Sequence, residues 1–268
     1  MVIALIVIIV LLLLFLLAVR GRSGRPELTE LRRFHYAHRG LHGNGVPENS
    51  MAAFRAALEH GCGIELDIHL LKDGTLAVIH DSQLKRTTGA EGIIEDLTAD
   101  DLTKYRLEGT EETIPTFQQV LELFDGKAPL IIELKPVKNQ AALAEAACKA
   151  LENYKGAYCM ESFDPRCLLW LKKHRPEIIR GQLSQNFMKS DEKLSPVIKF
   201  LLTHNLLNFL TAPDFIAYRF KHRKSTPSVA ICKNLWKMQC VGWTIRDKET
   251  HAAAQNEGWL SIFENFLP

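Results

Sequence analysis

Two patterns of hydrophobic residues divide this chain. Residues 1–19 form an unbroken apolar run without a charged side chain. From about residue 34 onward, short apolar runs alternate with segments whose hydrophobic residues recur at helical spacing. Strands that alternate with helices predict a parallel sheet, and a chain of 268 residues is long enough to close that sheet into one barrel.

The expected fold is a TIM-like (β/α)8 barrel over residues 34–268, preceded by a basic linker at residues 20–33. A polar segment with turn signals, residues 85–115, interrupts the alternation and is expected as an insertion over the barrel mouth. The sequence contains nine strand candidates, one more than an eight-stranded barrel needs. The weakest of them is residues 208–211. The candidate strands are 34–38, 63–70, 76–80, 130–134, 157–163, 179–183, 208–211, 239–245 and 259–264, and the candidate helices are 50–60, 140–154, 165–174, 196–204 and 248–257.

The apolar run at residues 1–19 has about the length needed to cross a bilayer core of roughly 30 Å. It lacks the basic start and small-residue cleavage site of a signal peptide, so an uncleaved transmembrane helix is expected. Arg20, Arg22 and Arg25 follow it, and the positive-inside rule places that side in the cytoplasm. The expectation is a single-pass membrane protein whose barrel faces the cytoplasm.

Charge and cysteine content give no support for a nucleic-acid-binding protein or for a protein held together by disulfides or zinc. The formal net charge is only +2, which gives no reason to expect a nucleic-acid partner. The six cysteines form no C-x-x-C pair and no zinc spacing, so unpaired thiols are expected.

Two acidic residues share one face of a predicted strand. In residues 63–70, Glu65 and Asp67 alternate with Ile64, Leu66 and Ile68. If the apolar face packs against the outer helices, both carboxylates point into the barrel, where they repel unless a cation lies between them. A hard divalent cation with oxygen ligands fits this requirement, whereas a solvated polar face of an edge strand is the structural alternative.

Further polar residues stand at the ends of other predicted strands, where barrel active sites are built. Glu133 and Lys135 end one strand and suggest a third metal ligand and a phosphate contact, or else a structural ion pair. His38 and His80 each end an apolar run and could act as general acid and base near neutral pH, although a single histidine is more often structural.

Two other side chains could contact substrate. Arg39 offers a guanidinium fork to a phosphate. Trp243 stands near a strand end and could form a pocket wall, or could simply belong to the core.

Together these motifs resemble the glycerophosphodiester phosphodiesterase family, in its membrane-anchored bacterial type, over roughly residues 35–268. The motifs occur in that family's order: His38-Arg39-Gly40, Pro47-Glu48-Asn49-Ser50, Glu65-Leu66-Asp67, Lys72-Asp73-Gly74, His80-Asp81, Arg86-Thr87-Thr88-Gly89, Ile114-Pro115-Thr116, Glu133-Leu134-Lys135, Ser162-Phe163 and Trp243-Thr244.

The resemblance implies a TIM barrel that binds a divalent metal ion, calcium or magnesium. It assigns the metal ligands to Glu65, Asp67 and Glu133, and it assigns the acid–base pair to His38 and His80. It further places Arg39 and Lys135 at the phosphate and Glu48 beside the first histidine and the metal.

The implied reaction hydrolyses a glycerophosphodiester to glycerol 3-phosphate and an alcohol through a cyclic phosphate. Two departures from the family pattern concern the substrate. Arg246 stands where the family usually has Asn, and Glu264 stands where its last strand usually has Asp.

Two alternatives stay open at this point. The chain could be a lysophospholipase D that acts on lysophospholipids at the bilayer, since membrane attachment sets location but not substrate. It could also be a non-catalytic, membrane-anchored lipid-binding barrel.

Overall fold

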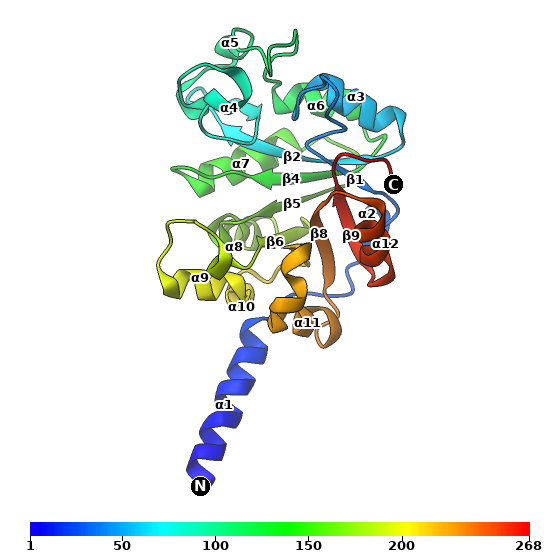
Figure 1. The fold of residues 1–268 in the computed structure, drawn as a ribbon. Coiled ribbons are helices and arrows are strands. Elements are labelled where there is room, and N and C mark those ends of the chain that lie inside the picture. The colour runs from blue at the N-terminus through cyan, green and yellow to red at the C-terminus, as the bar shows by residue number, and fades with distance from the viewer.

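Eight parallel strands form a closed barrel in the computed structural model, which describes residues 1–268. The neighbours follow the order β1-β9-β8-β7-β6-β5-β4-β2, and the pairing of β1 with β2 closes the ring (Figure 1). The predicted TIM-like (β/α)8 barrel is therefore confirmed. Its strands are β1 (Tyr36–His38), β2 (Gly63–Leu70), β4 (Leu130–Leu134), β5 (Tyr158–Ser162), β6 (Arg180–Ser184), β7 (Phe215–Arg219), β8 (Gln239–Ile245) and β9 (Trp259–Phe263).

The alternation of residues in β2 sets which side chains face the barrel interior. Ile64, Leu66 and Ile68 lie in the large core between the sheet and the outer helices, as predicted. Glu65 and Asp67 therefore point into the barrel. Below them a second apolar cluster, which includes Tyr36, Ile131 and Cys159, fills the interior.

Helices surround the barrel, and local capping explains where two of them begin. Ser50 accepts a hydrogen bond from Ala53 N at 3.1 Å, and Asp164 accepts one from Arg166 N at 2.9 Å, with Pro165 in the first turn. The outer helices are α3 (Met51–Glu59), α6 (Phe117–Phe124), α7 (Gln140–Ala150), α8 (Pro165–His174), α9 (Pro196–Thr203), α10 (Asn208–Thr211), α11 (Pro227–Asn234) and α12 (Lys248–Asn256), with 3-10 turns η2 (Phe187–Lys189) and η3 (Phe220–Ser225).

Two strand predictions were wrong. The run 76–80 contains only a short strand, β3 (Leu76–Val78), which pairs antiparallel with β2 outside the ring, so His80 does not end a barrel strand. The run 208–211 is the helix α10, in which the side chain of Asn208 donates to Val19 O at 3.0 Å. The barrel strand in this part of the chain is β7, a five-residue run that sequence periodicity did not single out.

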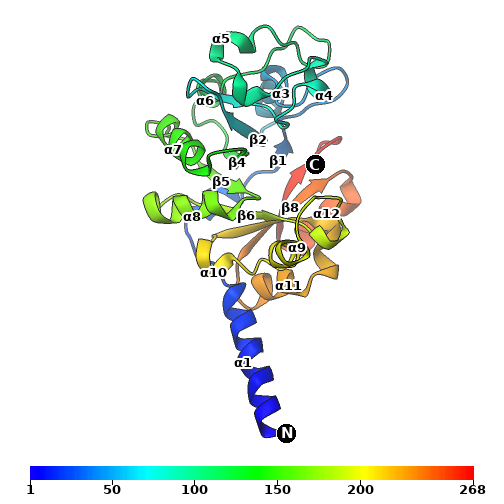
Figure 2. The ribbon, with the colours of Figure 1, turned by 90° about the vertical axis from the view of Figure 1, so that its left-hand side faces the viewer.

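The polar insertion was predicted correctly and borders the mouth of the barrel. It contains α4 (Lys85–Thr88), η1 (Ile94–Asp96) and α5 (Ala99–Leu102), and it packs around a small apolar core of its own. Figure 2 views the mouth and shows the insertion at the top, above the end of β2.

The N-terminal apolar run forms α1 (Val2–Ala18), a helix of 17 residues that projects from the barrel and buries none of its residues (Figures 1 and 2). No helix of the structure combines the length and the apolar character that crossing a membrane requires. This finding corrects the transmembrane helix expected over residues 1–19.

The segment expected as a linker, residues 20–33, packs across the barrel floor. It contains α2 (Leu28–Leu31), and both Leu28 and Leu31 join the apolar cluster inside the barrel. Arg22 forms an ion pair with the buried Asp214 at 2.6 Å. All six cysteines are buried free thiols.

Candidate active site

Three buried carboxylates meet at the mouth of the barrel. Glu65 and Asp67 come from β2, and Glu133 comes from β4, where it lies in register with Asp67. One oxygen from each of the three lies within 4.8 Å of the others. The structure thus brings together the three residues predicted to hold a metal ion.

The electrostatics of this group show that negative charge is crowded there. Burial raises the pKa of Glu133 to about 7 and, together with the neighbouring carboxylates, raises the pKa of Glu65 well above its ordinary value. Burial also acts on Asp67, but Lys135, His80 and Arg39 outweigh it and hold the pKa of that carboxyl low.

The donor set fits a hard divalent cation. Asp67 Oδ1 is buried and has no hydrogen-bond partner, and burial together with the neighbouring carboxylates raises the pKa values of Glu65 and Glu133, an effect that a bound cation would offset. Carboxylate oxygens are the ligands that calcium and magnesium prefer.

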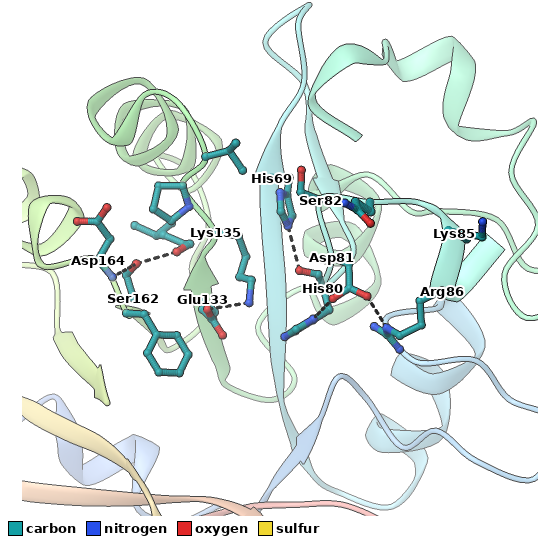
Figure 3. Close-up of a pocket in the computed structure, with 15 residues that line it drawn as sticks. His69, His80, Asp81, Ser82, Lys85, Arg86, Glu133, Lys135, Ser162 and Asp164 are labelled. Atoms are coloured by element: carbon teal, nitrogen blue, oxygen red, sulfur yellow. Dashed lines mark hydrogen bonds and ion pairs between the residues drawn. The ribbon is translucent and has the colours of Figure 1, made fainter. Parts of the chain in front are cut away.

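Lys135 lies beside the carboxylates, as its predicted role requires. Its Nζ is 3.1 Å from Glu133 Oε1 and 3.5 Å from Asp67 Oδ1. The two carboxylates hold the lysine charged and raise its pKa above the ordinary value although burial opposes this. A fixed ammonium group therefore stands next to the candidate metal site (Figure 3).

His38 ends β1 and is held by a carboxylate from the end of the barrel. Its Nδ1 lies 2.7 Å from Glu264 Oε2, and its Nε2 lies 3.9 Å from Glu65 Oε2. Arg246 Nε in turn donates to Glu264 Oε1 at 3.0 Å. Burial lowers the pKa of His38, and the hydrogen bond to Glu264 opposes this effect.

His80 has the same kind of partner. Its Nδ1 lies 2.6 Å from Asp81 Oδ1, and Asp81 also accepts a hydrogen bond from Arg86 Nε. Burial lowers the pKa of His80 as well. His80 lies in the segment after β3, outside the ring of barrel strands, and this segment places the histidine at the mouth.

Glu48 connects two arginines at the rim. It accepts from Arg39 NH1 at 2.9 Å and from Arg86 NH2 at 2.6 Å. Arg39 Nε also lies 3.5 Å from Asp67 Oδ2, an oxygen that accepts a hydrogen bond from Asn49 Nδ2 at 2.9 Å. Glu48 therefore orients Arg39 over the carboxylates.

Two cavities open beside the carboxylate group. One of about 730 Å³ is lined by His80, Glu133 and Lys135, and Figure 3 shows these side chains converging on it. The other, of about 710 Å³, is lined by His38, Arg39 and Trp243, together with the basic side chains Arg219, Lys221, Arg223 and Arg246. Trp243 thus forms a wall of the second cavity.

Phe163 of the first cavity meets Trp243 of the second edge to face, with ring centroids 5.6 Å apart. This aromatic contact lies between the two cavities.

Two acidic residues of the site were not singled out from sequence as parts of the acid–base machinery or the carboxylate group. Glu264 was noted only as a substitute for an aspartate, yet it binds His38. Glu161 lies in β5 in register with Glu133, is 1% exposed, and its Oε2 has no partner. The available signal was that Glu161 shares the inward face of a buried strand with Cys159, two residues earlier.

Comparisons with known proteins agree with this arrangement. The family model described as "Glycerophosphoryl diester phosphodiesterase family" matches residues 38–266. A glycerophosphodiester phosphodiesterase of Caldanaerobacter subterraneus subsp. tengcongensis is 39% identical over 160 residues, 56% of this chain and 65% of that protein, so the match spans just under two thirds of the relative. Lysophospholipase D GDPD1 of Rattus norvegicus is 34% identical over 134 residues, 45% of this chain and 41% of that protein.

A solved structure shares the fold. It is an Oleispira antarctica phosphodiesterase in complex with the product sn-glycerol-3-phosphate. The TM-score is 0.70 at 24% identity, and the match covers 86% of this chain and 92% of that one.

Proposed function

Because this chain belongs to the glycerophosphoryl diester phosphodiesterase family, we propose that it hydrolyses glycerophosphodiesters to glycerol 3-phosphate and an alcohol. One observation carries the proposal: two histidines, each bound through Nδ1 to a carboxylate, flank a buried group of three carboxylates. Such an arrangement can bind a phosphodiester and move protons on both sides of it.

The residues at the mouth suit a phosphodiester anion. Lys135 and Arg39 are cations with little freedom, since both are held by carboxylates, and each can meet a phosphate oxygen. The two cavities would receive the two ester arms, with Trp243 against the arm on the His38 side.

Proton transfer is the task of His38 and His80. Glu264 and Asp81 fix the two rings through Nδ1, which leaves Nε2 of each ring to face the substrate. One histidine takes the proton of the glycerol hydroxyl next to the phosphate, and that oxygen attacks phosphorus to form a cyclic phosphate. The other protonates the departing alcohol, and water then opens the ring with the two roles exchanged.

Glu65, Asp67 and Glu133 would hold a divalent cation, calcium or magnesium, with Glu48 supporting the site through Arg39. The bound cation would offset the negative charge that the phosphate gains in the transition state. Lys135 and Arg39 contribute to the same stabilisation from the protein side.

Activity as a lysophospholipase D is the second candidate, favoured by the exposed apolar helix α1 and by the name of the Rattus norvegicus relative. Product analysis separates the two activities. Faster release of choline from lysophosphatidylcholine than from glycerophosphocholine would favour the second candidate.

We also propose that α1 attaches the barrel to a membrane. Its residues are apolar on every side and nearly all are exposed, so they need a nonpolar environment that the barrel does not provide. The arginines that follow, Arg20, Arg22 and Arg25, favour the cytoplasmic leaflet, because its anionic lipids attract basic segments next to a membrane anchor. Flotation with vesicles, compared with a chain that lacks residues 2–18, tests the attachment, and protease protection in cells tests the side.

An activity screen tests the enzyme proposal directly. Purified protein is assayed on a panel of glycerophosphodiesters and lysophospholipids with calcium, magnesium or manganese supplied separately. Hydrolysis that depends on one of these ions is the expected result. No turnover on any substrate with any ion would instead favour a non-catalytic lipid-binding barrel.

A further inference from the structure

One group of exposed apolar side chains remains outside the proposed site. In a barrel, the outer helices normally bury their apolar side against the sheet, yet in α9 only Thr203 is fully buried. Val197 is 67% exposed and Phe209 is 55% exposed. We call this group the apolar face, and it consists of Met188, Leu194, Val197, Ile198, Phe200, Phe209 and Leu210.

The apolar face lies on the side of the barrel from which α1 projects. In Figures 1 and 2, α9, α10 and α11 lie at the lower part of the barrel, on the side where the C-terminal end of α1 meets it. Two hydrogen bonds fix this relation: Asn208 Nδ2 donates to Val19 O at 3.0 Å, and Trp236 Nε1 donates to Leu16 O at 2.9 Å. Phe209 and Leu210, the part of the apolar face in α10, therefore lie close to the end of α1.

Positive charge is concentrated in the same half of the chain. Residues 165–240 contain 14 Lys and Arg residues against 4 Asp and Glu residues, although the whole chain carries only +2. Lys189 of η2, Lys193 of the connecting segment and Lys199 of α9 stand among these apolar side chains, and Asp191 and Glu192 lie in the same connecting segment. Lysine side chains can lay their methylene stems on an apolar surface while the ammonium group reaches water or phosphate.

We propose that the apolar face seats in the headgroup region of an anionic lipid bilayer. The inference rests on the proposed attachment through α1, and it adds a second contact that fixes the barrel on the surface. Exposed apolar side chains with lysines among them are features by which a surface helix binds anionic lipids. A protein partner would require apolar contact but gives no reason for the excess of positive charge.

The proposal has a consequence for substrate delivery. The strand β6 ends at Ser184, at the end of the barrel where the active site opens, and the chain then passes through η2, which begins at Phe187, to α9, which begins at Pro196. Seating α9 on lipid therefore brings the mouth to the bilayer surface. A lysophospholipid could then reach the two cavities without crossing bulk water.

Hydrogen exchange of the full chain tests the contact. Backbone amides of residues 197–203 are followed with vesicles of phosphatidylcholine alone and with vesicles that also contain phosphatidylglycerol. We expect slower exchange on the anionic vesicles, and we expect the triple variant Val197→Ser, Ile198→Ser, Phe200→Ser to lose that protection. Unchanged exchange in α9 while the chain floats with the vesicles would overturn the proposal.

Activity separates this inference from the proposed function. The triple variant should hydrolyse soluble glycerophosphocholine at the parent rate but lysophosphatidylcholine in anionic vesicles about tenfold more slowly, because interfacial binding scales with buried apolar area. Leu267→Ser, which removes an exposed leucine from the chain terminus away from α9, is the matched control and should behave as the parent. Equal rates for the triple variant and the parent on vesicles would contradict the role of the face. If the parent does not hydrolyse soluble glycerophosphocholine, the proposed enzyme function is contradicted. The hydrogen-exchange experiment would still show whether the apolar face binds lipid.

Discussion

His38 and Glu264 are 226 residues apart in sequence, yet His38 Nδ1 lies 2.7 Å from Glu264 Oε2. The first and last strands of the barrel, β1 and β9, pair with each other and so create this contact. The carboxylate holds one ring nitrogen and opposes the lowering of the pKa of His38 by burial. The histidine in turn lowers the pKa of Glu264 to about 2.

Replacing Glu264 by Gln should change the pH dependence of the reaction. Loss of the carboxylate lowers the pKa of His38 further, so the limb of the pH–rate profile that reports His38 should move to lower pH. The rate should fall by about 10–100-fold, since the ring also loses its fixed orientation. The check is kcat/KM on glycerophosphocholine as a function of pH. An unchanged profile with an unchanged rate would show that Glu264 does not act through His38.

Replacing His80 by Ala should remove one of the two proton-transfer groups. Turnover should fall by about 10²–10⁴-fold while the fold is retained, because the side chain is part of the mouth and not of the core. The same substitution at His60, an exposed histidine at the end of α3, is the control and should leave the rate unchanged. Circular dichroism and kcat are measured on both variants. A His80 variant as active as the parent would remove this residue from the mechanism.

Replacing Glu133 by Gln should weaken metal binding. The parent should unfold at a higher temperature when calcium or magnesium is added, since a ligand that binds only the folded state stabilises it. The variant should lose most of this increase because one of three carboxylates has lost its charge. Thermal unfolding with and without each ion measures the effect. Equal stabilisation of parent and variant by the ion would show that Glu133 does not bind the metal. The control is Glu122→Gln on the exposed side of α6, which should keep the parent's stabilisation.

Replacing Glu161 by Gln should stabilise the metal-free protein at high pH. Burial raises the pKa of Glu161 well above its ordinary value of 4.5, so the folded state keeps a proton that the unfolded state releases. The free energy of unfolding is therefore highest below the unfolded-state pKa of Glu161. It falls as pH rises from that value toward the folded-state pKa. The neutral amide avoids that loss, so the variant should gain on the order of 1 kcal/mol or more relative to the parent at pH 8.

Urea unfolding at pH 5 and pH 8 in the presence of a chelator measures this difference. A gain of the same size at both values would show that the effect comes from packing and not from the charge of Glu161.

Much of the site could be predicted because the strand period is simple. Glu65 and Asp67 lie at i and i+2 of a strand whose other face is wholly apolar, and this pattern has only one reasonable orientation in a barrel. The positions of Glu133 and Lys135 were predicted from the same rule, because both stand at the end of another apolar strand. His38 was placed correctly at the end of β1 for the same reason.

The rest depended on contacts between distant segments, which local pattern does not contain. His80 was expected on a barrel strand, but β3 turns back antiparallel on β2 and lifts the histidine to the rim. A single acid inside a buried strand, Glu161, gives little signal until its register with Glu133 is known. The short strand β7 lies between a proline-containing turn and a basic run, so its five residues did not stand out.

The ion pair between Arg22 and Asp214 gives the N-terminal region a mechanical role. Leu28 and Leu31 are inserted in the barrel floor just after it, so residues 20–33 are fastened to the barrel at two points. The segment between α1 and the first barrel strand is therefore packed against the barrel and is not a free linker. A shortened protein must therefore keep residues 20–33, because without Leu28 and Leu31 the floor of the barrel is left open.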